Sequence, residues 1–161
     1  MQKVVITGHD LTVDQIIAVC REGAEVVLSD ESREKILASR QVVNELVEER
    51  KVVYGITTGF GKFSDVVISQ DECKLLQKNL IITHAVGAGD PFKEDIARGI
   101  LLLRVNSLSN GFSGICLETV ETMIAMLNKG VTPFIPEKGS LGASGDLAPL
   151  SHMVLPMIGL G

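Results

Sequence analysis

The chain has 161 residues, of which 45% are hydrophobic and 22% charged, and its formal net charge is −5. These totals are typical of one globular domain and argue against a nucleic-acid-binding surface. The sequence shows no secretory signal, no membrane-spanning stretch, no Cys-x-x-Cys pair and no Cys/His cluster at zinc spacing, so we expect a cytoplasmic protein without a metal site.

Short strands are predicted at three segments rich in β-branched residues: 3–7, 25–28 and 52–56. Between the first two, Thr12-Val-Asp-Gln15 is a capping box, which predicts a short helix ending near Arg21. Ser29 precedes a charged segment whose apolar side chains recur at helical spacing. We expect a helix there, with one face formed by Ile36, Val43, Leu46 and Val47.

Helices also account for most of the chain after residue 68. Ser69-Gln-Asp-Glu72 is a second capping box, and it precedes an apolar stripe of Leu75, Leu76, Leu80 and Thr83. Asp90-Pro91 predicts a cap and a first-turn proline for the next helix. We expect a further helix to begin at Ser113 and to end at Gly130.

The segment after Asp146 carries no formal charge and is predicted as a last helix, in which Pro149 is tolerated in the first turn and Pro156 produces a kink. An uncharged helix is normally covered all round by other helices. We therefore expect the chain to be part of a longer protein or an obligate oligomer. The predicted fold class is mainly α with a few short β-strands.

Two glycine-rich segments, 52–65 and 131–145, do not fit the helical pattern, and such loops often carry binding or catalytic residues. The second leads into GSLGASGDLAPLSH (139–152), whose serine suggests a nucleophile. The hydrolase pattern G-x-S-x-G fails, because Asp146 stands where the last glycine belongs. No Ser-x-x-Lys motif surrounds Ser144, and no phosphate-binding P-loop is present.

Ala143-Ser144-Gly145 can support another chemistry. Glycine allows the backbone to fold sharply, which brings the nitrogen of Gly145 close to the carbonyl carbon of Ala143. Attack by that nitrogen closes a five-membered ring and releases one water. Loss of a second water from the side chain of Ser144 leaves an exocyclic methylidene, which is an electrophile. The carboxylate of Asp146 is placed to move protons during these steps.

The motif GSLGASGDLAPLSHM resembles the signature of the histidine and aromatic amino acid ammonia-lyases, which form 4-methylideneimidazole-5-one (MIO) from Ala-Ser-Gly. YGITTGFG (54–61) is similar to the tyrosine loop of that family, and NLIITHAVGAG (79–89) to its substrate-facing segment. RVNSLSNGFSGI (104–115) is also family-like, so the similarity extends over most of the chain.

The resemblance implies the N-terminal part of the helical aromatic amino acid lyase fold, which is fumarase/aspartase-like. Residues 1–161 would form one N-terminal portion, with an α/β part at 1–68 and a helical part at 69–161. The family is homotetrameric, and its members are several times longer than this chain. The resemblance therefore implies a homotetramer for the full-length enzyme, little or no activity for this chain alone, and self-association through its apolar end.

The resemblance also implies roles for individual residues. Ala143, Ser144 and Gly145 would form the MIO cofactor, and Asp146 would assist its formation. Tyr54 would be the base at the β-carbon of the substrate. His84 would lie near the substrate side chain; a histidine at this position is similar to histidine ammonia-lyases and some tyrosine-specific relatives, and unlike phenylalanine-specific ones. His9 and His152 are interpreted as structural.

The resulting hypothesis is elimination of ammonia from L-histidine to give urocanate. A tyrosine or other aromatic amino acid ammonia-lyase or a 2,3-aminomutase would keep the same motifs. A non-catalytic fragment or interaction domain with uncyclised Ala-Ser-Gly is the alternative from another class. In that alternative Tyr54 and His84 are partly buried core residues, and Ser144 is a residue at the start of a helix.

Overall fold

The computed structural model describes residues 2–59 and 70–161, and it consists mainly of helices with four short strands among these residues. In chain order the elements are β1 (Lys3–Ile6), α1 (Val13–Arg21), β2 (Glu25–Leu28), α2 (Asp30–Glu48), α3 (Gln70–His84), β3 (Ala88–Pro91), α4 (Glu94–Leu108), α5 (Leu117–Lys129), β4 (Pro136–Lys138), the 3₁₀ turn η2 (Gly142–Ser144), α6 (Leu147–Val154) and η3 (Leu155–Ile158). The predicted fold class is confirmed.

The N-terminal helix signals are confirmed in detail. The Thr12 side chain accepts a hydrogen bond from the backbone of Gln15, and the Gln15 side chain accepts one from the backbone of Thr12, so the capping box of α1 is complete. Ser29 caps α2 through the backbone nitrogen of Ser32. Ser69, the first residue of the second predicted capping box, lies outside the described residues.

The predicted strand at 52–56 is wrong, because the chain forms a turn there. Gly55 takes a left-handed conformation with φ of 74°, which interrupts an extended strand. The Thr57 hydroxyl closes the turn: it donates to the carbonyl of Lys51 and accepts from the backbone nitrogen of Val53. Local side chain to backbone bonds therefore outweigh the β-propensity of the valines.

Two predicted helix starts are also wrong. Asp90 and Pro91 belong to β3, which pairs with β4 in antiparallel orientation, and α4 begins three residues later at Glu94. Helix α5 begins at Leu117 rather than near Ser113, because Gly114 between them has a left-handed φ of 66° that a helix cannot continue. Strands β3 and β4 were not predicted, since neither has the β-branched or aromatic residues typical of strands.

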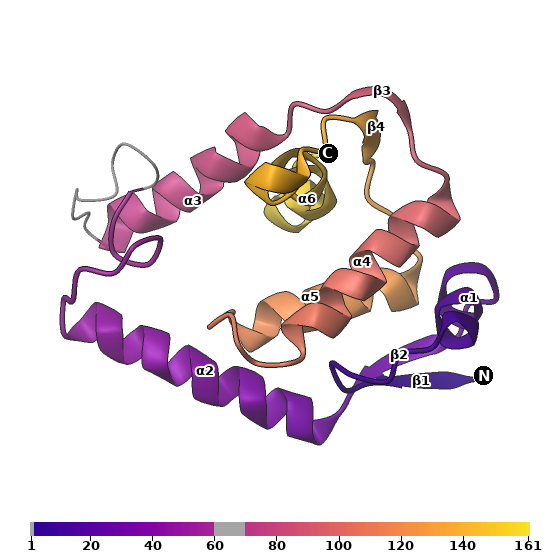
Figure 1. The fold of residues 1–161 in the computed structure, drawn as a ribbon, viewed down its shortest axis with the longest axis horizontal. Coiled ribbons are helices and arrows are strands. Elements are labelled where there is room, and N and C mark those ends of the chain that lie inside the picture. The colour runs from indigo at the N-terminus through magenta and orange to yellow at the C-terminus, as the bar shows by residue number, and fades with distance from the viewer. Residues whose placement is uncertain (1, 60–69) are drawn as a thin grey trace.

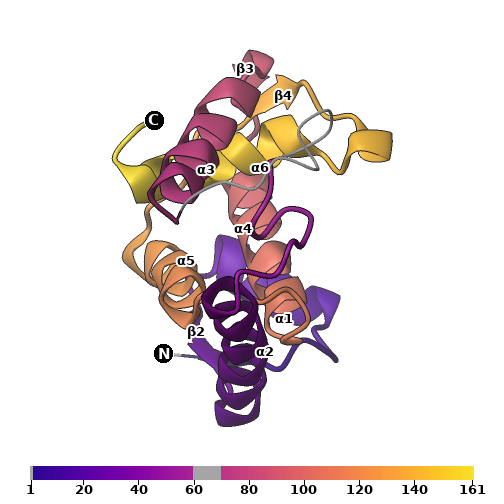
Figure 2. The same ribbon diagram turned by 90° about the vertical axis from the view of Figure 1, so that its left-hand side faces the viewer.

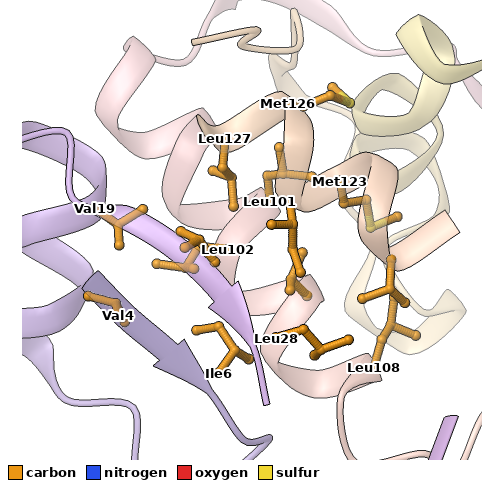
Figure 3. Close-up of a cluster of buried hydrophobic side chains, with 14 of the residues drawn as sticks. Val4, Ile6, Val19, Leu28, Leu101, Leu102, Leu108, Met123, Met126 and Leu127 are labelled. Carbon is orange, nitrogen blue, oxygen red and sulfur yellow. The ribbon is translucent and has the colours of Figure 1, made fainter. Parts of the chain in front are cut away.

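One hydrophobic core joins the parallel strands β1 and β2 to helices α1, α4 and α5 (Figure 3). The strands pair in register from Lys3 opposite Glu25 to Ile6 opposite Leu28. The amide of Asn128 at the end of α5 bonds to both the nitrogen and the carbonyl of Val26, at 2.8 and 2.9 Å. This amide satisfies backbone groups of β2 that its single partner strand leaves unpaired.

The side chain of Arg98 bridges the C-terminal ends of α1 and α5 within this core. Its buried guanidinium donates to the carbonyl of Val19 in α1 at 3.0 Å and to that of Leu127 in α5 at 3.2 Å. Carbonyls in the last turn of a helix lack partners within the helix and carry partial negative charge, so a cation is favourable there.

Elements α3, β3, β4 and α6 form a second group, and Met153 of α6 reaches the core. Helix α6 packs against α3, and the β3–β4 pair lies next to them, whereas β1, β2, α1, α2 and α5 lie on the other side of the molecule (Figures 1 and 2). Helix α4 runs from one group toward the other.

The buried core contains residues on both sides of position 68, and the predicted division into parts 1–68 and 69–161 stays a prediction. Within the described residues, no helix is both long and apolar enough to cross a membrane.

Candidate functional site

The Ala-Ser-Gly motif forms a tight, exposed turn immediately before α6. Gly142 to Ser144 make one turn of 3₁₀ helix, and the backbone nitrogen of Gly145 donates to the carbonyl of Gly142 at 3.1 Å. Gly145 has φ of 88°, a left-handed conformation that glycine adopts without strain. The Ser144 hydroxyl donates to the carbonyl of Leu141 at 2.8 Å. The chain therefore reverses direction at these small side chains, as the sequence predicts.

Asp146 follows the turn with a strained backbone and a fixed side chain. Its φ of 56° is left-handed, although it is not glycine. Its carboxylate does not cap α6; instead it accepts a hydrogen bond from the hydroxyl of Ser140. This bond holds the carboxylate beside the Ala143–Gly145 turn, where the sequence places a proton-transfer group.

The segment that leaves α3 lies against the segment that leads into α6. The backbone nitrogen of Gly87 donates to Nε2 of His152, which projects from α6, at 3.0 Å. A Cβ on Gly139 would lie 3.1 Å from the Cα of Gly87, so these two glycines allow close contact between the backbones. Ala88 pairs with Lys138 in the β3–β4 ladder. The fold thus brings together two sequence motifs, 79–89 and 139–152, that are far apart in the chain.

His84 is the last residue of α3 and is half-buried. Its Nδ1 lies 2.8 Å from the carbonyl of Leu80, and a carbonyl can only accept, so Nδ1 carries the proton. The other ring nitrogen, Nε2, is then an acceptor in the neutral ring. An acceptor at the end of α3, on the segment that approaches α6, is suited to binding an N–H group.

Tyr54 lies apart from this group. It occupies the turn between α2 and α3, and 61% of it is exposed. Figure 1 shows the stretch 51–59 beside the start of α3, at the other end of this helix from His84. The rest of the predicted tyrosine loop, Phe60 and Gly61, lies outside the described residues. The structure therefore brings the segment that follows His84 against the segments on either side of the Ala143–Asp146 turn, whereas Tyr54 lies on the stretch 51–59.

A family model described as aromatic amino acid lyase matches residues 11–161, which is nearly the whole chain. The chain belongs to the aromatic amino acid lyase family. The match includes the segments 79–89 and 139–152.

The chain is also similar to individual members of this family. Histidine ammonia-lyase from Caldanaerobacter subterraneus subsp. tengcongensis is 62% identical over all 161 residues. The crystal structure of histidine ammonia-lyase from Trypanosoma cruzi has a TM-score of 0.91 at 43% identity and covers 99% of this chain. Tyrosine aminomutase from Streptomyces globisporus has a TM-score of 0.91 at 39% identity, also over 99%.

This chain spans about a third of the length of the relatives it matches: 32% of the Caldanaerobacter protein and 30% of each of the two solved chains. Two surface depressions on the described residues lie away from the site. One surrounds Arg98 between α1, α4 and α5, and the other follows α2 beside Phe112. Neither is lined by Tyr54, His84 or the Ala143–Asp146 turn.

Sequence reasoning missed two contacts of this region. Ser140 was not singled out, although its hydroxyl binds Asp146, and His152 was assigned a structural role without a partner. The spacing of Ser140 six residues before Asp146 was the only sequence feature that could have suggested a hydrogen bond between the two side chains. The pairing of Gly87 with His152 had no sequence signal, because 65 residues separate the two positions.

Proposed function

We propose that this chain is part of a histidine ammonia-lyase, which eliminates ammonia from L-histidine and forms urocanate. The observation that carries the proposal is the Ala143–Gly145 turn followed by Asp146, in a chain 62% identical to a histidine ammonia-lyase. The nearby acceptor of His84 supports histidine as the substrate, because an imidazole N–H is a matching donor.

The geometry of the turn fits formation of the family's 4-methylideneimidazole-5-one group from Ala143, Ser144 and Gly145. These residues are small and exposed, and a side-chain atom added at Gly145 would have no neighbour within 4 Å. Space around the turn leaves the backbone free to compress as the ring closes. When formed, the group supplies an electrophile that captures the substrate and assists departure of ammonia.

Asp146, with Ser140 bound to its carboxylate, supplies proton transfer for this cyclisation. The carboxylate accepts the hydrogen bond of Ser140, so its position beside the turn is maintained. Closing the ring removes a proton from the nitrogen of Gly145, and each dehydration needs a proton on the departing oxygen. A fixed carboxylate can accept the proton from the nitrogen of Gly145 and return it to a departing oxygen.

Tyr54 and His84 have separate roles in the proposal. The Tyr54 side chain takes the proton from the β-carbon of the substrate, and His84 binds the imidazole of the substrate through Nε2. Tyr54 lies on the stretch between α2 and α3, and in the proposal it serves a site completed by another subunit. The proposed assembly is a cytoplasmic homotetramer.

The experiment uses the full-length enzyme, wild type and Ser144→Ala, with L-histidine as substrate. We expect urocanate from the wild type and at least a thousandfold less from the variant, which lacks the hydroxyl that must leave as water. Intact mass should be two waters below the sequence value only in the wild type. Ser113→Ala, at another exposed serine that precedes a glycine, is the matched control and should retain both properties.

Three outcomes would contradict parts of the proposal. A wild-type mass equal to the sequence value would exclude the cyclised group, and full activity of Ser144→Ala would exclude its role. Conversion of L-tyrosine to a β-amino acid, without urocanate from histidine, would instead establish an aminomutase, which the 39% identity to tyrosine aminomutase makes the second candidate. The 161-residue chain is expected to lack activity alone.

A further inference from the structure

We propose that His152 is a positioning residue, whose ring holds the segment 84–89 against α6 and so sets the place of His84 relative to the Ala143–Gly145 turn. The proposal rests on the proposed function, because it concerns how that site binds its substrate. His152 does not itself face the reacting atoms; it acts through the backbone of Gly87.

The contact links two elements that carry the site. Gly87 is three residues after His84 at the end of α3, and His152 is six residues after Asp146 in the second turn of α6. A single hydrogen bond of 3.0 Å joins the nitrogen of Gly87 to Nε2 of His152. A shift of this bond therefore changes the distance between the end of α3 and the start of α6.

Close packing at Gly87 makes the position of the bond specific. A Cβ on Gly87 would lie 2.9 Å from Cγ of Pro136 and 3.1 Å from Nε2 of His152. On the opposite side, Gly139 has φ of 130° and approaches the Cα of Gly87. The backbone of Gly87 is thus enclosed by Pro136, Gly139 and His152, so a small displacement of the ring is transmitted to the segment 84–89.

The ring must be neutral to perform this role. Nε2 accepts from a backbone N–H, which leaves Nδ1 as the protonated nitrogen of the neutral tautomer. Burial lowers the pKa of His152 from its ordinary value of 6.5, which favours the same neutral form. Apolar side chains of equal size would fill the space but would leave the nitrogen of Gly87 without an acceptor.

The test compares His152→Leu with His152→Gln in the full-length enzyme. Leucine removes the acceptor, whereas glutamine keeps one at the end of a side chain of similar length. We expect His152→Leu to raise the KM for L-histidine about five- to tenfold, the factor carried by one ordinary hydrogen bond, with kcat within about twofold of wild type. His152→Gln should restore most of the difference. His9→Leu, at an exposed histidine, is the matched control and should leave KM unchanged.

Two further measurements separate positioning from simple destabilisation. Amide hydrogen exchange of residues 85–89 should increase in His152→Leu and remain near wild type in His152→Gln, because the nitrogen of Gly87 reports the bond directly. Intact mass should still be two waters below the sequence value in both variants. An unchanged KM despite faster exchange, or an equal rise in KM in both variants, would overturn the proposal.

Failure of the proposed function gives a different pattern. If the wild type makes no urocanate but converts another aromatic amino acid, KM is measured with that substrate and the same prediction applies. If His152→Leu does not fold, Gly87→Ala tests the same contact. The added methyl group would press on Pro136 and on the ring of His152, and it should raise KM without a substitution in α6. An unchanged KM in Gly87→Ala would then overturn the positioning role.

Discussion

The two groups of elements differ in how they use apolar side chains. Around α4 and α5 the large side chains are enclosed, and Leu101 and Leu102 have no exposed surface (Figure 3). Around the site, Val86 is 70% exposed and Leu141 64% exposed. The core is therefore held by burial within this chain, whereas the region of the site combines the buried Ala148 and Met153 of α6 with hydrogen bonds, backbone contacts and exposed apolar side chains. Changes in the core should mainly reduce stability, and changes at the site should mainly reduce activity.

The largest expected effect is loss of stability in Leu101→Ala. Removing a fully enclosed leucine leaves a cavity, and the free energy of unfolding should fall by about 2–5 kcal/mol. Urea denaturation of this chain, followed by circular dichroism, measures the change. Leu141→Ala is the matched control near the site and should cost less than about 0.5 kcal/mol, because its side chain is already exposed. Equal losses would contradict the distinction between the two groups.

Arg98→Leu should cost about 2 kcal/mol, although leucine is apolar. The substitution leaves the carbonyls of Val19 and Leu127 buried without the guanidinium that binds them. The same denaturation measurement applies. Arg98→Lys should recover less than half of the loss, since one ammonium cannot reproduce the planar fork that reaches both helix ends. Full recovery with lysine would show that charge alone matters.

Gly139→Ala should reduce stability by about 1 kcal/mol but reduce kcat/KM in the full-length enzyme about tenfold or more. Its φ of 130° disfavours any side chain, and the new Cβ would press on Gly87. Gly23→Ala is the matched control, because it has φ of 73° and no neighbour within 4 Å. That variant should lose similar stability without loss of activity. Equal activity losses would attribute the effect to backbone strain alone.

The smallest expected effect is a pH dependence from His152. Burial lowers the pKa of its ring in the folded chain, so below pH 6.5 the unfolded chain binds the proton more readily. Its contribution to stability is present above pH 6.5 and is lost as the pH falls through the lowered pKa. The melting temperature of the wild type should fall more between pH 7.5 and about 5 than that of His152→Gln. Identical pH profiles would contradict a buried neutral ring.

Local signals in the sequence were sufficient for several elements. The Thr12 capping box, the Ser29 cap and the Gly130 terminator each act within one helical turn, so neighbouring residues predict them. Predictions failed where a distant strand or a turn changed the local preference. Asp90-Pro91 is a reasonable start for a helix, but pairing of β3 with β4 places it in a ladder instead.

The left-handed turn at Gly145 and the adjacent carboxylate of Asp146 could be expected from the sequence alone, because they depend on neighbouring residues of one backbone. Only the tertiary structure decided that the segment after His84 lies against the segment leading into α6 and that His152 binds Gly87. These relations depend on how α3 and α6 pack. Packing is set by the combined surfaces of whole elements, and no short stretch of sequence records it.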